Sequence, residues 1–173
     1  MNNFVIGVDL GVDGGISLLS VDDRKLIDFE VMPTKIKIVN KKEKRVIDII
    51  EVLRLFSRWG LDHNIVALAM EVLSAFPGQS SQTGFSLGYS SGVFESLSTF
   101  FNIPCFKYRP VEWQKEMFKG INYAKGQTKS ASVEVATTLF PGVDFKASDR
   151  CKKNHDGLTD SVLIGLYHIK TGL

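Results

Sequence analysis

The chain has 173 residues, the size of one domain and large enough to bury a core without disulfide bonds or a structural metal. Hydrophobic residues make up 44% of it and charged residues 23%, which excludes long disorder, and the net charge is only +2. Its 2 cysteines exclude a disulfide framework, and we expect neither a targeting segment nor a membrane span. The sequence therefore predicts one cytoplasmic domain over residues 1–173.

Short apolar, β-branched runs predict strands, because turn-forming residues separate them. In chain order, the expected strands are Phe4–Val8, Ile16–Val21, Leu26–Met32, Ile65–Met70 and Cys105–Tyr108. The first three follow one another as a meander with short turns between them. Pro33 ends the third strand, and we expect a lysine-rich loop to follow it.

Apolar residues at helical spacing, together with capping residues, predict the helices. They are Val46–Trp59 with Gly60 as its C-terminal cap, Gln82–Phe101, Pro110–Phe118, a helix from the N-cap Thr128 to Phe140, and Asp156–Ile169. A strand meander followed by alternating helices and strands predicts an α/β fold. We expect a five-stranded mixed sheet flanked by helices.

Positive charge gathers in three stretches of the chain, 35–45, 107–129 and 146–153. Between Arg58 and Lys107 there is no Lys or Arg at all. Cationic clusters beside such a stretch favour a polyanion-binding surface next to a separate acidic site. Solvated loops would give the same pattern, so each cluster taken alone leaves both explanations open.

Acidic residues lie where a sheet exposes a site. Asp9 directly follows the first apolar run and Glu71 the fourth. If these strands are parallel neighbours, about 4.8 Å apart, both carboxylates emerge at one end of the sheet. Asp156 and Asp160 are four residues apart on the last helix and share one face. Four oxygen ligands meeting at one place would suit a hard cation such as Mg²⁺.

Each acid also has a purely structural explanation. Asp9 would shape a turn before Leu-Gly, and Glu71 would be a solvated loop residue. Asp156 would be a helix N-cap, with Asp160 near the positive end of the same helix. These explanations are weakest for Asp9 and Glu71 together, because each ends an apolar run.

Several short motifs follow one another along nearly the whole chain: Ile6–Gly11, Val31–Thr34, Met70–Glu71, Phe76–Gln79, Gly84–Gly88, Gly92–Glu95 and Lys153–Ser161. This ordered set resembles a RuvC-type Holliday junction resolvase of the compact phage-type branch. The resemblance implies an RNase H-like fold, a homodimer, and Mg²⁺-dependent resolution of four-way DNA junctions. The expected products are paired, symmetrical nicks with 5′-phosphate and 3′-hydroxyl ends.

The resemblance also assigns roles to the acids. Asp9 and Glu71 match the first two catalytic acids of the family, and Asp160 matches the last. The preceding acid corresponds to Asp156 or its neighbour His155, and we assign Asp156. These four residues would hold two Mg²⁺ ions per site, with Mn²⁺ able to substitute.

DNA contacts are expected from basic residues and from one aromatic side chain. Lys41, Lys42 and Lys44 belong to the first cationic cluster, and Lys125 and Lys129 match family lysines that approach DNA. Phe76, in the loop after Glu71, either stacks on an unpaired base at the junction centre or packs as an ordinary core residue.

Glycines recur every four residues at 84, 88 and 92 on one expected helix. Glycine disfavours helix by about 1 kcal/mol relative to alanine, so we expect close packing in return. That packing is either against the chain's own sheet or across a dimer interface.

Other functions are compatible with the same fold. The chain would be a nuclease for other branched DNA or for RNA–DNA hybrids, or a catalytically inert junction-binding protein. The resemblance to the phage-type branch indicates a phage source and, in that case, action in the host cytoplasm.

Overall fold

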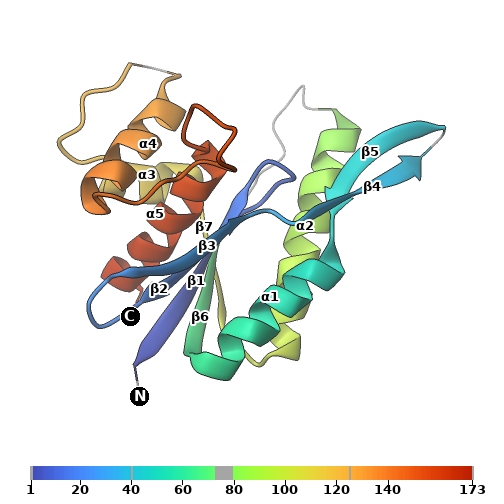
Figure 1. Cartoon of the computed structure of the whole chain (residues 1–173), viewed down its shortest axis with the longest axis horizontal. Coiled ribbons are helices and arrows are strands. Elements are labelled where there is room, and N and C mark those ends of the chain that lie inside the picture. The colour runs from blue at the N-terminus through green and yellow to red at the C-terminus, as the bar shows by residue number, and fades with distance from the viewer. Residues whose placement is uncertain (1, 40, 73–79, 125, 173) are drawn as a thin grey trace.

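A computed structural model describes residues 2–39, 41–72, 80–124 and 126–172. Its centre is a five-stranded mixed sheet of order β3-β2-β1-β6-β7 (Figure 1). The strands are β1 Asn3–Asp9, β2 Gly15–Ser20, β3 Leu26–Val31, β6 Asn64–Glu71 and β7 Cys105–Tyr108. β1, β2 and β3 pair antiparallel, whereas β6 runs parallel to both β1 and β7. The predicted five-stranded mixed sheet is therefore confirmed.

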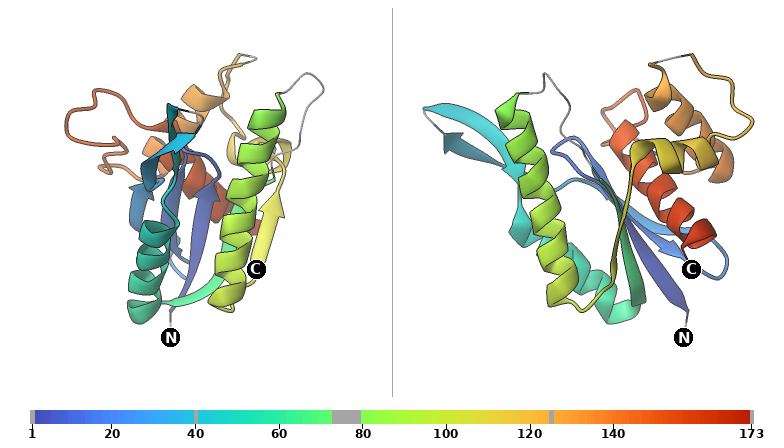
Figure 2. Two further views of the ribbon diagram at one scale, coloured as in Figure 1. Left: turned by 90° about the vertical axis from the view of Figure 1, so that its right-hand side faces the viewer. Right: turned by 180° about the vertical axis from the view of Figure 1, so that it is seen from behind.

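Helices cover both faces of this sheet (Figures 1 and 2). One face carries α1 Ile49–Asp62 and α2 Ser81–Phe100. The other carries α3 Pro110–Met117, α4 Thr128–Leu139 and α5 Asp156–Thr171. No helix in these described ranges is long and apolar enough to cross a membrane.

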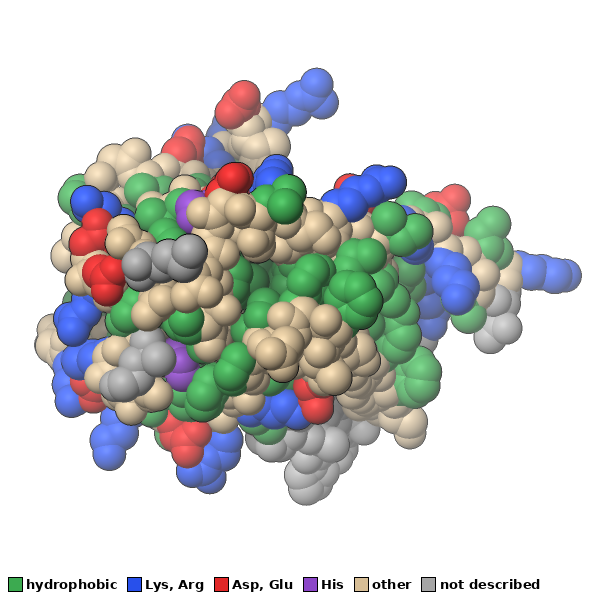
Figure 3. Space-filling model, turned by 90° about the horizontal axis from the view of Figure 1, so that it is seen from below, with side chains coloured by type: hydrophobic (Ala, Val, Ile, Leu, Met, Phe, Trp, Pro, Cys, Tyr) green, Lys and Arg blue, Asp and Glu red, His purple; other side chains and the backbone are tan. Residues whose placement is uncertain are grey.

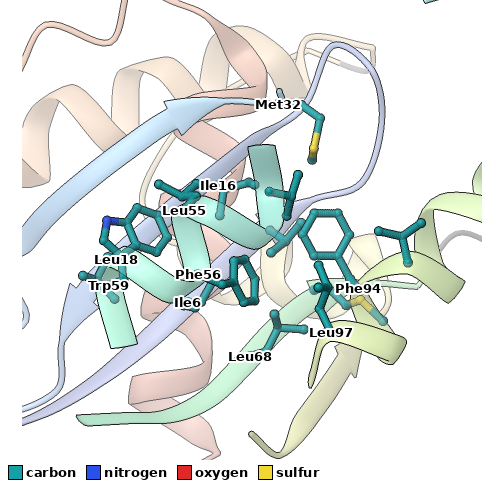
Figure 4. Packing of buried hydrophobic residues seen from close by; sticks show 14 of the residues in the cluster. Ile6, Ile16, Leu18, Met32, Leu55, Phe56, Trp59, Leu68, Phe94 and Leu97 are labelled. Carbon is teal, nitrogen blue, oxygen red and sulfur yellow. The ribbon is translucent and has the colours of Figure 1, made fainter. Parts of the chain in front are cut away.

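The apolar runs of the central strands are continuous because both faces are buried. Successive side chains alternate between the faces, so Ile6 joins the cluster under α1 and α2 while Val5 joins the cluster under α3, α4 and α5. In the first cluster Phe56 of α1 and Phe94 of α2 meet over β1 and β6 (Figure 4). The sheet thus has a core on each side, and packing on both faces holds the ends of its central strands in place.

The expected lysine-rich loop after Pro33 is wrong. Residues Thr34–Val39 and Lys42–Ile47 form strands β4 and β5, an antiparallel hairpin that makes a separate two-stranded sheet. Lysines alternate with Ile36 and Ile38 along β4, which is a strand pattern, but the density of charge concealed it.

The helix expected over Val46–Trp59 is wrong at both ends. Val46 belongs to β5, and the helix begins after Asp48, whose side chain accepts from the Ile50 backbone N–H at 3.2 Å. It then continues through Gly60 to Asp62. A side chain at Gly60 would meet nothing within 4 Å, so this glycine is solvent-facing helix and not a cap. Similarly, Thr128 is helical and Gln127 is the N-cap.

Candidate active site

Asp9 and Glu71 lie at the same end of the sheet. Each is the last residue of its strand, and the two strands are parallel neighbours in which Val8 is opposite Met70. The carboxyl ends of β1 and β6 therefore present both side chains together, as the sequence predicted.

Helix α5 brings the other two acids to this end. Asp156 opens the helix and Asp160 follows one turn later. The helix lies directly on β1 because Gly7 has no side chain: a Cβ there would be only 2.1 Å from the Ser161 carbonyl oxygen. At the start of the helix, a Cβ on Gly157 would be 2.4 Å from the Asp13 carbonyl oxygen. These close approaches determine where Asp156 and Asp160 lie.

Three of the acids share a cavity of about 460 Å³. Asp9, Asp156 and Asp160 line it together with Arg45 and Lys129. Glu71 is half-buried, and its charge acts on both Asp9 and Asp160. The four sequence-predicted acids are therefore one electrostatic cluster.

Burial and mutual repulsion make this cluster hard to ionise. Burial raises the pKa of Asp9 well above its usual range, and the charges of Asp160 and Glu71 raise it further. Burial also raises the pKa of Asp160 to about 7, with Glu71 contributing in the same direction. The pKa of Glu71 is raised as well, again by burial.

Asp156 differs from the other three. Burial acts to raise its pKa, but the ion pair with Lys129 outweighs this and lowers it, so Asp156 stays ionised. The pKa of Lys129 is raised in turn by the hydrogen bond to Asp156. Lys129, predicted to contact DNA, thus has its ammonium group in the acidic cavity.

Two buried neutral donors orient Glu71 and Asp160, and the sequence analysis missed both. Trp113 of α3, only 1% exposed, donates from Nε1 to Glu71 Oε1 at 2.9 Å. Ser132 of α4 is fully buried, and its hydroxyl donates to Asp160 Oδ1. The spacing of Ser132 from Lys129, three residues along one helix, was the available signal, because such residues share a face.

The sequence analysis counted Arg45 only as part of the cationic stretch 35–45, because its segment was expected to be a loop. From β5 its Nη2 donates to the Val12 carbonyl oxygen and lies 2.9 Å from Asp13 Oδ1. The hairpin is thereby attached to the turn that follows Asp9.

The four carboxylates are suitable ligands for a hard divalent cation. As they lie, no three His, Cys, Asp or Glu side chains among the described residues are close enough together to hold a metal ion. Carboxylate oxygens are the ligands that Mg²⁺ and Mn²⁺ prefer. Asp9 and Asp160 have pKa values raised partly by neighbouring negative charge, and a bound cation would relieve that repulsion.

The remaining predicted residues lie in several places. Lys41 precedes β5, and Lys42 and Lys44 are part of it, so these lysines lie on the hairpin. His155 is the N-cap of α5. Of these two neighbours, Asp156 is the one among the described residues that line the cavity. Phe76 and Lys125 lie outside the described residues.

The glycine stripe of α2 does not pack against the sheet. Among the residues that the structure describes, a Cβ at Gly84, Gly88 or Gly92 would meet nothing within 4 Å. The first of the two expected explanations is therefore wrong, and a dimer interface stays a prediction.

Comparisons with known proteins place the fold. No protein-family model matches the chain, and no curated protein matches it in sequence. RuvC from Thermus thermophilus, 15% identical, matches in structure with a TM-score of 0.58, covering 98% of this chain and 96% of its own, and has also been solved in complex with a Holliday junction substrate.

Two further solved structures are similar. The yeast mitochondrial Holliday junction resolvase is 16% identical, with a TM-score of 0.56 over 96% of this chain and 77% of its own. Fowlpox virus resolvase, solved with substrate Holliday junction DNA, is 16% identical, with a TM-score of 0.51 over 96% of this chain and 99% of its own. The chain therefore shares its fold with these Holliday junction resolvases, as its motifs implied.

Proposed function

We propose that the chain is a structure-selective, metal-dependent DNA endonuclease that resolves Holliday junctions by paired nicks. The observation that carries this proposal is the clustering of Asp9, Glu71, Asp156 and Asp160 at the carboxyl ends of two parallel strands of a resolvase fold. Two of the similar structures hold Holliday junction DNA, which supports the same substrate class.

Asp9, Glu71 and Asp160, with Asp156 at the rim, would hold the metal, and we propose two Mg²⁺ ions for which Mn²⁺ can substitute. Bound metal would activate a water and stabilise the leaving 3′ oxygen in attack on phosphorus. The chain itself orients the ligands: Trp113 and Ser132 hold Glu71 and Asp160 in place. Lys129 puts a cation in the same cavity, where a phosphate oxygen of bound DNA would meet it.

DNA contacts and assembly follow from the surface around the site. Lys41, Lys42 and Lys44 of the hairpin would contact the DNA backbone, together with Lys125 and, at the junction centre, Phe76. A homodimer would place one site on each of two opposed strands, because a four-way junction has approximate two-fold symmetry. The open glycine stripe of α2 is the surface that we propose for it. We further propose a phage source and action in the host cytoplasm.

The test incubates the protein with labelled four-way junction, fork, linear duplex and RNA–DNA hybrid, with and without Mg²⁺. Paired nicks on opposed strands of the junction are expected, leaving 5′-phosphate and 3′-hydroxyl ends. Asp9→Asn should abolish cleavage and leave junction binding intact, because a neutral amide keeps the shape but loses the charge that holds the metal.

Other outcomes would redirect the assignment. Equal cutting of forks would broaden the activity to branched DNA in general, and cutting of the hybrid alone would replace the junction as substrate. Binding without cleavage by the unsubstituted chain would show an inert junction-binding protein and contradict the proposal.

A further inference from the structure

A hollow of about 520 Å³ lies between the β4–β5 hairpin and helix α2. The hairpin contributes Lys35, Lys37 and Lys44 to its lining, and α2 contributes Phe85 and Tyr89. Figure 1 shows the hairpin projecting beside the N-terminal half of α2, and Figure 3 shows Lys and Arg side chains gathered on this projecting part beside a hydrophobic area. We call this feature the hairpin hollow.

Two lysines of the hollow lie so that their charges repel each other across the hairpin. Lys37 and Lys44 are directly opposite each other in the β4–β5 register, so both lie on one face. Like charges in such a pair destabilise a sheet. Neither lysine forms an ion pair with the acidic side chains that the structure describes, whereas Lys35 lies 3.1 Å from Asp48. An anion between Lys37 and Lys44 would remove the repulsion.

The aromatic side chains of the hollow are exposed. Phe85 is 76% exposed and Tyr89 46%, one helical turn apart on α2. Exposed rings beside unpaired cations are what a single nucleic-acid strand requires, because bases stack on the rings and phosphates meet the cations.

The hollow borders on the cavity that Asp9, Asp156 and Asp160 line. Val12, Arg45, Ser86 and Ser90 line both. The base of the hairpin is also fixed, because Ile47 is buried and the Asp48 backbone N–H donates to the Pro33 carbonyl oxygen at 2.8 Å. Its lysine face therefore has a set orientation toward the catalytic end.

We propose that the hairpin hollow binds a single-stranded stretch of DNA that continues from the strand held in the carboxylate cavity. Phosphates lie between Lys37 and Lys44, and a base stacks on Phe85 or Tyr89. This role rests on the nuclease function proposed above and sharpens it, because strands near a branch point are locally unpaired and those of a continuous duplex are not.

The test measures binding without cleavage, in metal-free buffer. A single-stranded oligonucleotide and a four-way junction, each carrying 2-aminopurine, are titrated with the chain and with two double variants. Lys37→Gln/Lys44→Gln should bind the oligonucleotide about tenfold more weakly, and its slope of log K against log salt should fall by about 1.4, since about 0.7 is lost per phosphate contact on single strands. Phe85→Leu/Tyr89→Leu should lose the quenching of 2-aminopurine that stacking produces.

Matched controls separate this site from general effects. Arg24→Gln/Lys25→Gln removes two charges from the turn between β2 and β3, at the opposite end of the sheet, and should bind as the unsubstituted chain does. Phe100→Leu removes an equally exposed ring, 74% exposed, from the far end of α2 and should keep the quenching. Thermal unfolding checks that every variant folds.

Two results would overturn the proposal. One is unchanged affinity and salt slope in Lys37→Gln/Lys44→Gln. The other is a shift of the monomer–dimer equilibrium in Phe85→Leu/Tyr89→Leu with the quenching intact, which would assign the hollow to contact between copies of the chain. If the expected binding changes occur but the chain nicks no DNA, the proposed nuclease function is wrong and the proposed binding of single-stranded DNA in the hollow is supported.

Discussion

Helices α5 and α2 both carry glycines at four- or eight-residue spacing, but the two helices lie in opposite environments. On α5, a Cβ at Gly157 or Gly165 would lie within 2.5 Å of another atom, because the helix lies directly on the sheet. On α2, the stripe of Gly84, Gly88 and Gly92 has no described residue within 4 Å of where a Cβ would lie. The buried helix carries Asp156 and Asp160 into the site, whereas the open one is free to meet a partner. Glycines therefore allow close packing inside the fold on α5, whereas on α2 they lie on the surface.

The largest effect should be that of Asp160 of α5 on the pH dependence of the free energy of unfolding. The pKa of Asp160 is raised from 3.8 to about 7, so its protonated form stabilises the fold below pH 4 and that stabilisation is lost as pH rises through 7. The free energy of unfolding without metal should fall by up to about 4 kcal/mol across this window through Asp160. Asp160→Asn should remove this component, as urea unfolding from pH 4 to 8 would measure. Parallel pH profiles for the two proteins would contradict it.

The close approach of α5 to β1 should be nearly as sensitive. Gly7→Ala puts a methyl group where the Ser161 carbonyl oxygen lies, and the backbone of a packed helix cannot move aside cheaply. We expect a loss of about 3 kcal/mol in the free energy of unfolding, together with loss of cleavage, because Asp160 moves with the helix. Chemical denaturation and the junction assay measure both. Retention of full activity would show that α5 does not set the geometry of the site.

The donor to Glu71 should affect metal binding more than folding. Trp113→Phe keeps the ring packing but removes the N–H that orients Glu71. Affinity for Mn²⁺, measured by calorimetric titration, should fall about 10- to 100-fold. Trp59→Phe is the matched control, since Trp59 donates to Asp28 at 2.9 Å away from the cavity. Equal effects of the two substitutions would deny Trp113 a positioning role.

The smallest effect on the free energy of unfolding is expected on α2, where a substitution should stabilise the fold, whereas Gly7→Ala should destabilise it. Gly88→Ala adds a methyl group that meets nothing, so helix propensity alone should raise the free energy of unfolding by about 1 kcal/mol. Urea unfolding at low protein concentration measures it, and light scattering reports the dimer. A gain in stability with a weaker dimer would assign the stripe to the interface between copies. A loss of stability would break the contrast with α5.

Much of the fold was predictable because its signals are local. The strand ends at Asp9 and Glu71 follow from where apolar runs stop, and the pair Asp156 and Asp160 follows from helical spacing. The β4–β5 hairpin was not predicted, because lysines supply its exposed alternation and charge density is typical of loops. The glycine spacing on α2 and α5 does not reveal which glycines meet the sheet, because spacing shows only that residues share a face.

The sequence by itself determined the four candidate acids and the order of the elements other than the β4–β5 hairpin, because periodicities of about two and 3.6 residues and strand ends are properties of neighbouring residues. Only the tertiary structure decided which groups surround those acids. Trp113 lies 42 residues from Glu71 and Ser132 lies 28 from Asp160 along the chain, and Arg45 reaches Val12 across 33. Such contacts depend on how helices and hairpin dock on the sheet, and docking is governed by the shapes of surfaces that no local pattern specifies.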